Sequence, residues 1–388
     1  MGGTGLKRSL IGIAAALLMI MPVVAMCAPA RAETVPDQWT VMVYMDGDNN
    51  VESYALKDLE EMKLTGSSTD VNIVVLLDTL SGPANLLYVN KGSTTTLAAW
   101  GEVNMGDPAT LTRLITDSKT LYPADKYSLV VWDHGGGIMG ICWDDTSASD
   151  RLTMAEFRSG IAGGNTVFDV IVLNACVMAT AEVAHQVTGY ADYVIFSQEN
   201  MYALGFPYDQ VTADLEAQPT MDGRTMALMM AQDYTDYYIS IGYSGVTISV
   251  YDMTQLTTVA NAIKAFASAQ VSTMSTNYKA FMKIRHSVPD PNNQADLVTY
   301  AQLVAASADI TSTTVKTTAG AVVTAVNAAI IYEWHSDDVT EENGLGIWFP
   351  TKSVTYYWGA SLETMYRAMP FSAASGWADF LDSYYAKG

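Results

Sequence analysis

The chain has 388 residues, enough for two domains or for one large domain with an extension. Hydrophobic residues make up 49% of it and charged residues only 16%, which is typical of a folded protein and excludes a wholly disordered one. The 41 acidic residues outnumber the 20 basic ones, for a formal net charge of -21. This charge argues against nucleic acid and against an anionic membrane surface as partners.

The first 32 residues have the pattern of a secretory signal peptide. Lys7 and Arg8 precede an apolar run over 10–26, and a small-residue cleavage site ends at Ala32. We expect cleavage after Ala32 and a secreted, periplasmic or extracellular protein without membrane contact once the signal is removed. Two alternatives are an uncleaved anchor, for which the run is short, and a lipoprotein at Cys27, where a methionine precedes the cysteine.

Strands alternate with helices over the next two hundred residues. We predict strands at 39–45, 71–77, 127–132, 168–173 and 193–197, a hairpin at 84–100, and helices at 51–64, 111–121, 153–163 and 178–188. Continuous apolar strands that alternate with helices favour a mostly parallel sheet covered by helices on both faces. The sequence therefore predicts an α/β core over residues 33–240.

The pattern changes beyond residue 240 to helices rich in alanine and threonine. We predict helices at 255–270, 296–308 and 313–333, a short apolar stretch at 344–350, and a last helix at 377–385. These elements predict a helical C-terminal subdomain over 241–388 that packs on the core.

Two reactive side chains follow consecutive strands of the predicted core, His134 and Cys176. Ligands of an open parallel sheet bind beyond the carboxyl ends of its strands. An imidazole that takes the proton of a thiol makes a nucleophile able to attack an amide carbonyl, and the backbone amides of Gly135 and Cys176 are candidate donors to the oxyanion. The alternatives are a Cys142–Cys176 disulfide, the default for two cysteines in an exported protein, or a purely structural cysteine and histidine.

Several segments resemble the clostripain-like cysteine peptidases of the caspase-like clan. They are residues 44–50, 131–135, 169–176 and 197–200, joined downstream by 296–300 and 344–350. The resemblance implies a caspase-like α/β sandwich and a secreted cysteine endopeptidase that acts on polypeptides through a dyad, with His134 as base and Cys176 as nucleophile. We expect a monomer.

The residue two positions before Cys176 departs from the family pattern. Family members that cut after Arg or Lys have an Asp there, whereas this chain has Asn174. Loss of a charge-assisted contact costs about 1.5 to 3 kcal/mol, so the preference for basic residues is weakened. Asp209 or Glu199 could restore the charge, and a preference for neutral or small residues is the alternative.

Family members can also be cut between the histidine and the cysteine. The polar segment 144–150 is followed by Arg151, which is the candidate processing site. A solvated loop in an enzyme that acts as a single chain is the alternative interpretation.

The sequence assigns no metal ligands and no required cofactor. Acidic and amide side chains alternate over 46–52 as in a calcium loop, but Val51 stands where an EF-hand needs glycine and Lys57 occupies the twelfth position. A catalytic zinc is not expected because the other histidines lack paired-ligand spacing: His185, His286 and His335. The resemblance leaves calcium open elsewhere in the protein.

Two further alternatives come from other functional classes. The segment from His134 to Gly137 matches the oxyanion motif of esterase-type hydrolases, but the chain lacks the Gly-x-Ser-x-Gly elbow that such enzymes need. A catalytically silent binding protein on a peptidase scaffold would be expected to lose the dyad, and both members are present.

Overall fold

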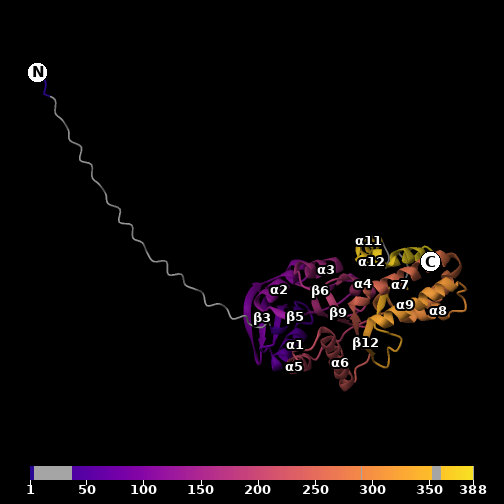
Figure 1. Cartoon of the computed structure of the whole chain (residues 1–388), viewed down its shortest axis with the longest axis horizontal. Helices are drawn as coiled ribbons and strands as arrows, with labels where there is room; N and C mark the ends of the chain where they lie inside the picture. Colours follow the sequence, from indigo (N-terminus) through magenta and orange to yellow (C-terminus); the bar gives the residue numbers. More distant parts are fainter. Residues whose placement is uncertain (4–36, 290, 352–359, 388) are drawn as a thin grey trace. The chain divides into compact units, whose positions relative to one another are not determined.

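The computed structural model describes residues 1–3, 37–289, 291–351 and 360–387 (Figure 1). The predicted signal peptide lies outside the described residues except for its first three, and Cys27 lies outside them as well. The described residues from Asp37 onward belong to one compact unit. Among the described helices, none has both the length and the apolar character that crossing a bilayer requires.

The centre of this unit is a mixed sheet, which among the described residues has nine strands in the order β12-β10-β9-β8-β5-β1-β2-β3-β4. The five strands from β9 to β2 run parallel, and the strands at both edges pair antiparallel. Their bounds are β1 Asp37–Gly47, β2 Val71–Thr79, β3 Gly82–Asn90, β4 Ser93–Gly101, β5 Ala124–Trp132, β8 Phe168–Asn174, β9 Ala191–Phe196, β10 Thr247–Asp252 and β12 Ile330–His335. The mostly parallel sheet predicted for the core is confirmed.

Helices cover both faces of the sheet because successive side chains of each strand point to opposite sides. Val41 and Val43 pack with α1 (Glu52–Thr65), α5 (Tyr208–Ala217) and α6 (Gly223–Ile241). Met42 and Tyr44 belong to the larger core on the other face. Figure 1 shows the first helix group on one side of the strands, with α2 and α3 on the other.

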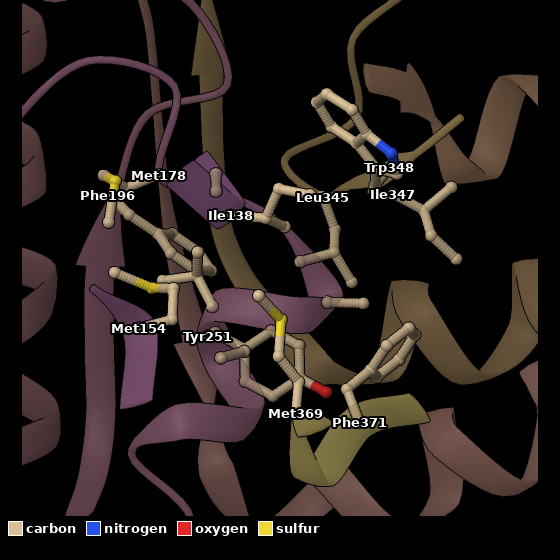
Figure 2. Packing of buried hydrophobic residues seen from close by; sticks show 14 of the residues in the cluster. Ile138, Met154, Met178, Phe196, Tyr251, Leu345, Ile347, Trp348, Met369 and Phe371 are labelled. Carbon is tan, nitrogen blue, oxygen red and sulfur yellow. The ribbon is translucent and has the colours of Figure 1, made fainter. Parts of the chain in front are cut away.

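The larger core is built by helices from distant parts of the chain. They are α2 (Pro108–Leu121), α3 (Met154–Gly163), α4 (Ala181–Gln186), α7 (Leu256–Arg285), α8 (Leu297–Ala306), α9 (Thr313–Ala329), α11 (Ala360–Ala368), α12 (Pro370–Ser375) and α13 (Trp377–Tyr385). Figure 2 shows Phe196 and Tyr251 of the sheet beside Met154 of α3, with Met369 and Phe371 close by. The C-terminal part of the chain therefore shares its core with the sheet.

Three predicted helices have different limits in the structure. The helix predicted at 313–333 ends at Ala329, because the β-branched and aromatic side chains of 330–335 form β12. The helix predicted at 255–270 continues to Arg285. The helix predicted at 178–188 begins only at Ala181, because the preceding backbone pairs with other segments, for example through Ala179 N–H to the Ser197 carbonyl.

The part after residue 240 is mostly helical, as expected, but it also supplies β10 and β12 to the central sheet. Helices α5 and α6 were not predicted. The division of the chain at residue 240 stays a prediction. Two small antiparallel pairs complete the frame around the site: β6 (Ile141–Asp144) with β7 (Asp150–Leu152), and β11 (Gln294–Asp296) with β13 (Gly346–Trp348).

Candidate active site

The register of the sheet brings His134 and Cys176 to the same place. Strands β5 and β8 are parallel neighbours in which Trp132 lies opposite Asn174, and each reactive residue follows two positions later. Both line a pocket of about 120 Å³, together with Asn174. The structure thus brings together the two residues that the sequence predicted as a dyad.

Gly135 lies directly against the backbone of Cys176. A Cβ atom at position 135 would be 2.3 Å from the carbonyl oxygen of Cys176 and 2.8 Å from its nitrogen, so only glycine fits. The backbone groups of Gly135 and Cys176 lie close enough to the thiol to lower its pKa, against the larger effect of burial. The backbones of Gly135 and Cys176 therefore lie close together beside the thiol.

The Cys176 thiol is half-buried, and its Sγ lies 3.6 Å from the carbonyl oxygen of Met201. Burial raises the pKa of the Cys176 thiol, so the thiol is protonated in the resting site at neutral pH. The two described cysteines, Cys142 and Cys176, are both free. The alternative of a Cys142–Cys176 disulfide is therefore not realised among the described residues.

His134 is oriented by Asn50, which the sequence reasoning noted only as part of a loop. The Nε2 of His134 lies 2.8 Å from the Oδ1 of Asn50. Because an amide oxygen can only accept, Nε2 carries the hydrogen and the neutral ring keeps Nδ1 as its basic nitrogen. Burial lowers the pKa of His134, and the nearby Asp145 opposes this shift. The resting pair is a neutral thiol and a neutral imidazole.

A buried carboxyl group anchors the loop that carries Asn50. Asp133 Oδ1 accepts a hydrogen bond from the side-chain amide of Asn49 at 2.8 Å, and its Oδ2 accepts one from the backbone N–H of Trp143 at 2.6 Å. The Asn49 amide also donates to the Trp143 carbonyl at 2.9 Å. The loop between β1 and α1 and the β6–β7 hairpin are therefore both tied to the residue that precedes His134.

Of the predicted substrate-binding residues, Asn174 lines the pocket of Cys176. Asp58 of α1 lies behind it: the Asn174 Nδ2 and the Asp58 Oδ2 are 3.0 and 3.1 Å from the point where a Cβ of Gly205 would sit. Asp58 is fully buried and accepts a hydrogen bond from Trp132 Nε1 at 2.8 Å. Burial raises the pKa of Asp58 to about 8. Asp58 is therefore mostly protonated at neutral pH.

The other two predicted substrate-binding residues do not line this pocket. Asp209 is exposed at the start of α5, where it borders a separate acidic hollow with Asp214 and Asp236. The backbone carbonyl of Glu199 accepts a hydrogen bond from the Val177 N–H at 3.1 Å, next to the nucleophile. Neither carboxylate stands in for the charge that Asn174 lacks within the pocket.

The predicted processing residue, Arg151, lies in a paired strand. It is opposite Trp143 in the β6–β7 hairpin, and its Nε donates to the Met139 carbonyl at 2.7 Å. The following residue, Leu152, is fully buried. Cleavage after Arg151 therefore requires the hairpin to open first.

A group of acidic side chains at the same edge of the sheet escaped the sequence reasoning. The carboxylates of Asp48, Asp78, Glu102 and Asp144 come together so that one oxygen of each lies within 4.8 Å of the others. Asp48 was noted within a calcium-like motif, whereas Asp78 and Asp144 lie at the ends of β2 and β6, and Glu102 follows β4. Their spacing along the chain carried no signal for this grouping.

Comparisons with known proteins agree with this arrangement. The sequence model of the clostripain family matches residues 43–384. Clostripain of Hathewaya histolytica is 32% identical over 223 residues, which are 46% of this chain and 42% of that protein. The chain thus covers less than half the length of this relative.

Two solved structures share the fold over most of the chain. A secreted C11 cysteine protease from Bacteroides thetaiotaomicron, in complex with an irreversible peptide inhibitor, has a TM-score of 0.67 at 21% identity and covers 88% of this chain and 99% of its own. An inactive zymogen C11 protease from Parabacteroides distasonis has a TM-score of 0.68, with the same identity and coverage. These likenesses confirm the caspase-like sandwich. Because the family model spans nearly the whole described core, the chain belongs to the clostripain family.

Proposed function

We propose that this protein is a secreted cysteine endopeptidase that hydrolyses peptide bonds through His134 and Cys176. The observation that carries the proposal is that both side chains line one pocket while Gly135 packs against the backbone of Cys176. Membership of the clostripain family supports the same reaction class. This arrangement supplies a nucleophile, a base and oxyanion donors within one small volume.

The reaction begins from the neutral pair. His134 Nδ1 takes the thiol proton as Sγ attacks the carbonyl carbon, and the amides of Gly135 and Cys176 hold the oxyanion. The imidazolium then protonates the leaving amine, the C–N bond breaks, and a thioester remains on Cys176. A water molecule deprotonated by His134 attacks the thioester, which releases the new carboxyl terminus and restores the thiol.

The residues around the pocket support only a weak preference for Arg or Lys before the scissile bond. Asn174 offers an amide without charge, and Asp58 behind it is protonated near neutral pH because burial raises its pKa to about 8. A basic side chain is already protonated, so it would have to favour release of the Asp58 proton to solvent or bind without a charged partner. Neutral side chains that form hydrogen bonds with Asn174 avoid this cost.

Export and single-chain activity without a required cofactor are parts of the same proposal, which leaves calcium open. The signal-peptide pattern supports export, and one structural neighbour is described as secreted. The pairing of Arg151 within a hairpin favours an enzyme that works without internal cleavage. Polypeptides are the proposed substrates, and a monomer is the proposed state.

The test is turnover of a fluorogenic peptide library, varied at the residue before the scissile bond, by residues 33–388. We expect Cys176→Ala and His134→Ala to abolish turnover, and Cys142→Ala, which removes a buried thiol outside the pocket, to keep it. Alkylation with iodoacetamide, followed by intact-mass spectrometry of the wild type and the two cysteine variants, identifies the reactive thiol. Full turnover after stoichiometric alkylation of Cys176 would refute the dyad. A folded wild-type protein that cleaves none of the library, even after limited proteolysis, would favour a silent binding protein.

A further inference from the structure

The residue that follows the proposed nucleophile has an unusual backbone conformation. Val177 is buried and has a φ of 54°, in the left-handed region that β-branched residues rarely adopt. Such conformations persist only where the surrounding structure holds the backbone, and they are frequent at active sites. Neighbouring groups must therefore hold Val177 in place.

Hydrogen bonds hold the peptide groups on both sides of Val177. The Val177 N–H donates to the Glu199 carbonyl at 3.1 Å, which fixes the peptide group that joins Val177 to Cys176. The Val177 carbonyl accepts a hydrogen bond from the side-chain Nε2 of Gln294 at 2.9 Å, which fixes the next peptide group. Because peptide groups are planar, holding both of them sets the φ and ψ of the residue between them.

Gln294 lies 117 positions away from Val177 in the chain, and its own backbone is well anchored. It begins β11, where it pairs with Trp348 of β13, and its backbone carbonyl accepts a hydrogen bond from the buried Arg285 at 3.3 Å. Its side chain is buried as well. A carbonyl oxygen can only accept a hydrogen bond, so the NH2 group of the Gln294 amide is the one that faces Val177.

The same side chain lies next to the loop that follows His134. A Cβ atom on Gly137 would be 2.6 Å from the Nε2 of Gln294 and 3.2 Å from the Val177 carbonyl oxygen. The backbone at Gly137 therefore approaches both groups closely, and its φ of +57° also favours glycine. The amide of Gln294 thus lies beside the segment that carries the proposed base as well as the one that carries the nucleophile.

We propose that Gln294 is a positioning residue for the nucleophile. Its amide holds the Val177 carbonyl, which keeps Val177 in its left-handed conformation and thereby sets the direction of the adjoining Cys176 backbone. That backbone carries the thiol and one of the proposed oxyanion donors, so a change at Val177 would move both relative to His134. The effect on catalysis rests on the proposed function, whereas the effect of Gln294 on the backbone does not.

The effect on the backbone is tested with Gln294→Met, which keeps the approximate length and shape of the side chain but cannot donate a hydrogen bond. Hydrogen–deuterium exchange is followed by mass spectrometry in a peptide that contains residues 174–180. In the wild type, the Val177 N–H in this segment is bound to the Glu199 carbonyl. We expect the amides of this segment to exchange at least about 10-fold faster in the variant, because the local structure opens more easily.

Gln270→Met is the matched control. Gln270 is also buried, and its side-chain amide donates to the Tyr300 hydroxyl at 2.6 Å, outside the pocket of Cys176. This variant loses a buried hydrogen bond of the same kind, so its melting temperature should fall by a similar amount. Exchange in 174–180 and kcat should stay as in the wild type.

A second variant at position 294 covers the case in which Gln294→Met does not fold. Gln294→Asn keeps the amide but withdraws it by one methylene group, so it should change exchange in 174–180 in the same direction. Unchanged exchange in that segment in the folded variants of Gln294 would overturn the proposal.

In the peptidase assay, Gln294→Met should lower kcat about 10- to 100-fold, because the reacting groups are misplaced. KM should change by less than about 3-fold, because Asn174 lies before the affected segment. A loss in KM alone would contradict a role in positioning the nucleophile.

Two substitutions of Val177 show whether Gln294 acts through the backbone conformation. Val177→Ala and Val177→Gly both remove the valine side chain, but only glycine adopts a positive φ without strain. Gln294→Met should therefore lower kcat about 10- to 100-fold in the Val177→Ala background and less than about 3-fold in the Val177→Gly background. Equal losses in the two backgrounds would overturn the proposed mechanism of positioning.

Failure of the proposed function gives a different result. If the wild-type protein and all the variants cleave no peptide, the proposed peptidase activity is wrong. The exchange of 174–180 in Gln294→Met and Gln270→Met still decides whether Gln294 holds the backbone beside Cys176.

Discussion

The contact between Asn50 and His134 makes a prediction that a single substitution can test. Asn50 Oδ1 lies 2.8 Å from His134 Nε2, so Asn50→Asp places a carboxylate of nearly the same shape against the ring. A carboxylate stabilises the protonated imidazole and therefore raises the pKa of His134. In the wild-type enzyme burial lowers this pKa, so the acid limb of the activity profile should lie below pH 6.5.

The expected size of the shift follows from the geometry. Two unit charges about 4 Å apart attract by about 1 kcal/mol in bulk water and about 4 kcal/mol at an effective dielectric constant near 20. Asn50 is exposed and His134 is half-buried, so we take about 1 to 2 kcal/mol. That energy corresponds to a rise of about 0.7 to 1.5 in the pKa of His134. As the pH is lowered, His134 of the Asn50→Asp variant is then protonated at a higher pH than in the wild-type enzyme. The variant is therefore less active than the wild type near pH 6 and similar to it near pH 8.

The assay is kcat/KM for a peptide substrate as a function of pH. Asn50→Ala removes the contact without adding charge, and should lower kcat/KM about 2- to 10-fold by loss of one hydrogen bond. Asn165→Asp adds the same charge at an exposed position outside the pocket and should leave the profile unchanged. An active Asn50→Asp enzyme with the wild-type acid limb would refute the role of Asn50. A wild-type limb above pH 6.5 would refute the effect of burial on His134.

Three further predictions concern Gly135, Asp58 and Asn174. Gly135→Ala would bring a Cβ to 2.3 Å from the Cys176 carbonyl oxygen and displace an oxyanion donor. We therefore expect kcat to fall about 100- to 1000-fold with little change in KM. An unchanged kcat would contradict the role of Gly135 as an oxyanion donor. Burial raises the pKa of Asp58 to about 8, so between about pH 4 and pH 8 the folded protein keeps a proton that the unfolded chain has lost, and stability falls as pH rises. Asp58→Asn should therefore raise Tm more at pH 8 than at pH 5, and an equal change at both would count against the buried acid. Asn174→Asp should increase turnover of peptides with Arg or Lys before the scissile bond, and an unaltered library profile would mean that Asn174 does not face that side chain.

The sequence predicted structure correctly where a buried strand appears as a continuous apolar run. The apolar runs before His134 and before Cys176 identified β5 and β8, and parallel strands present their carboxyl ends at one edge. Sequence alone therefore placed the two reactive residues together. The same reasoning failed at 330–335, where a helical pattern continued into residues that the antiparallel partner β10 holds as a strand.

What the sequence determined by itself was the α/β class, the positions of the core strands along the chain and the candidate dyad, because each depends on periodicity or on a strand end. Only the tertiary structure decided which groups surround that dyad. Asn50 contacts His134 from the loop after β1, Asp58 of α1 lies near Asn174 and Gly205, and Asp78 joins Asp48 only because β1 and β2 pair in register. These contacts join residues separated by many positions, and the distances between such residues are set by packing and strand register, which no local pattern encodes.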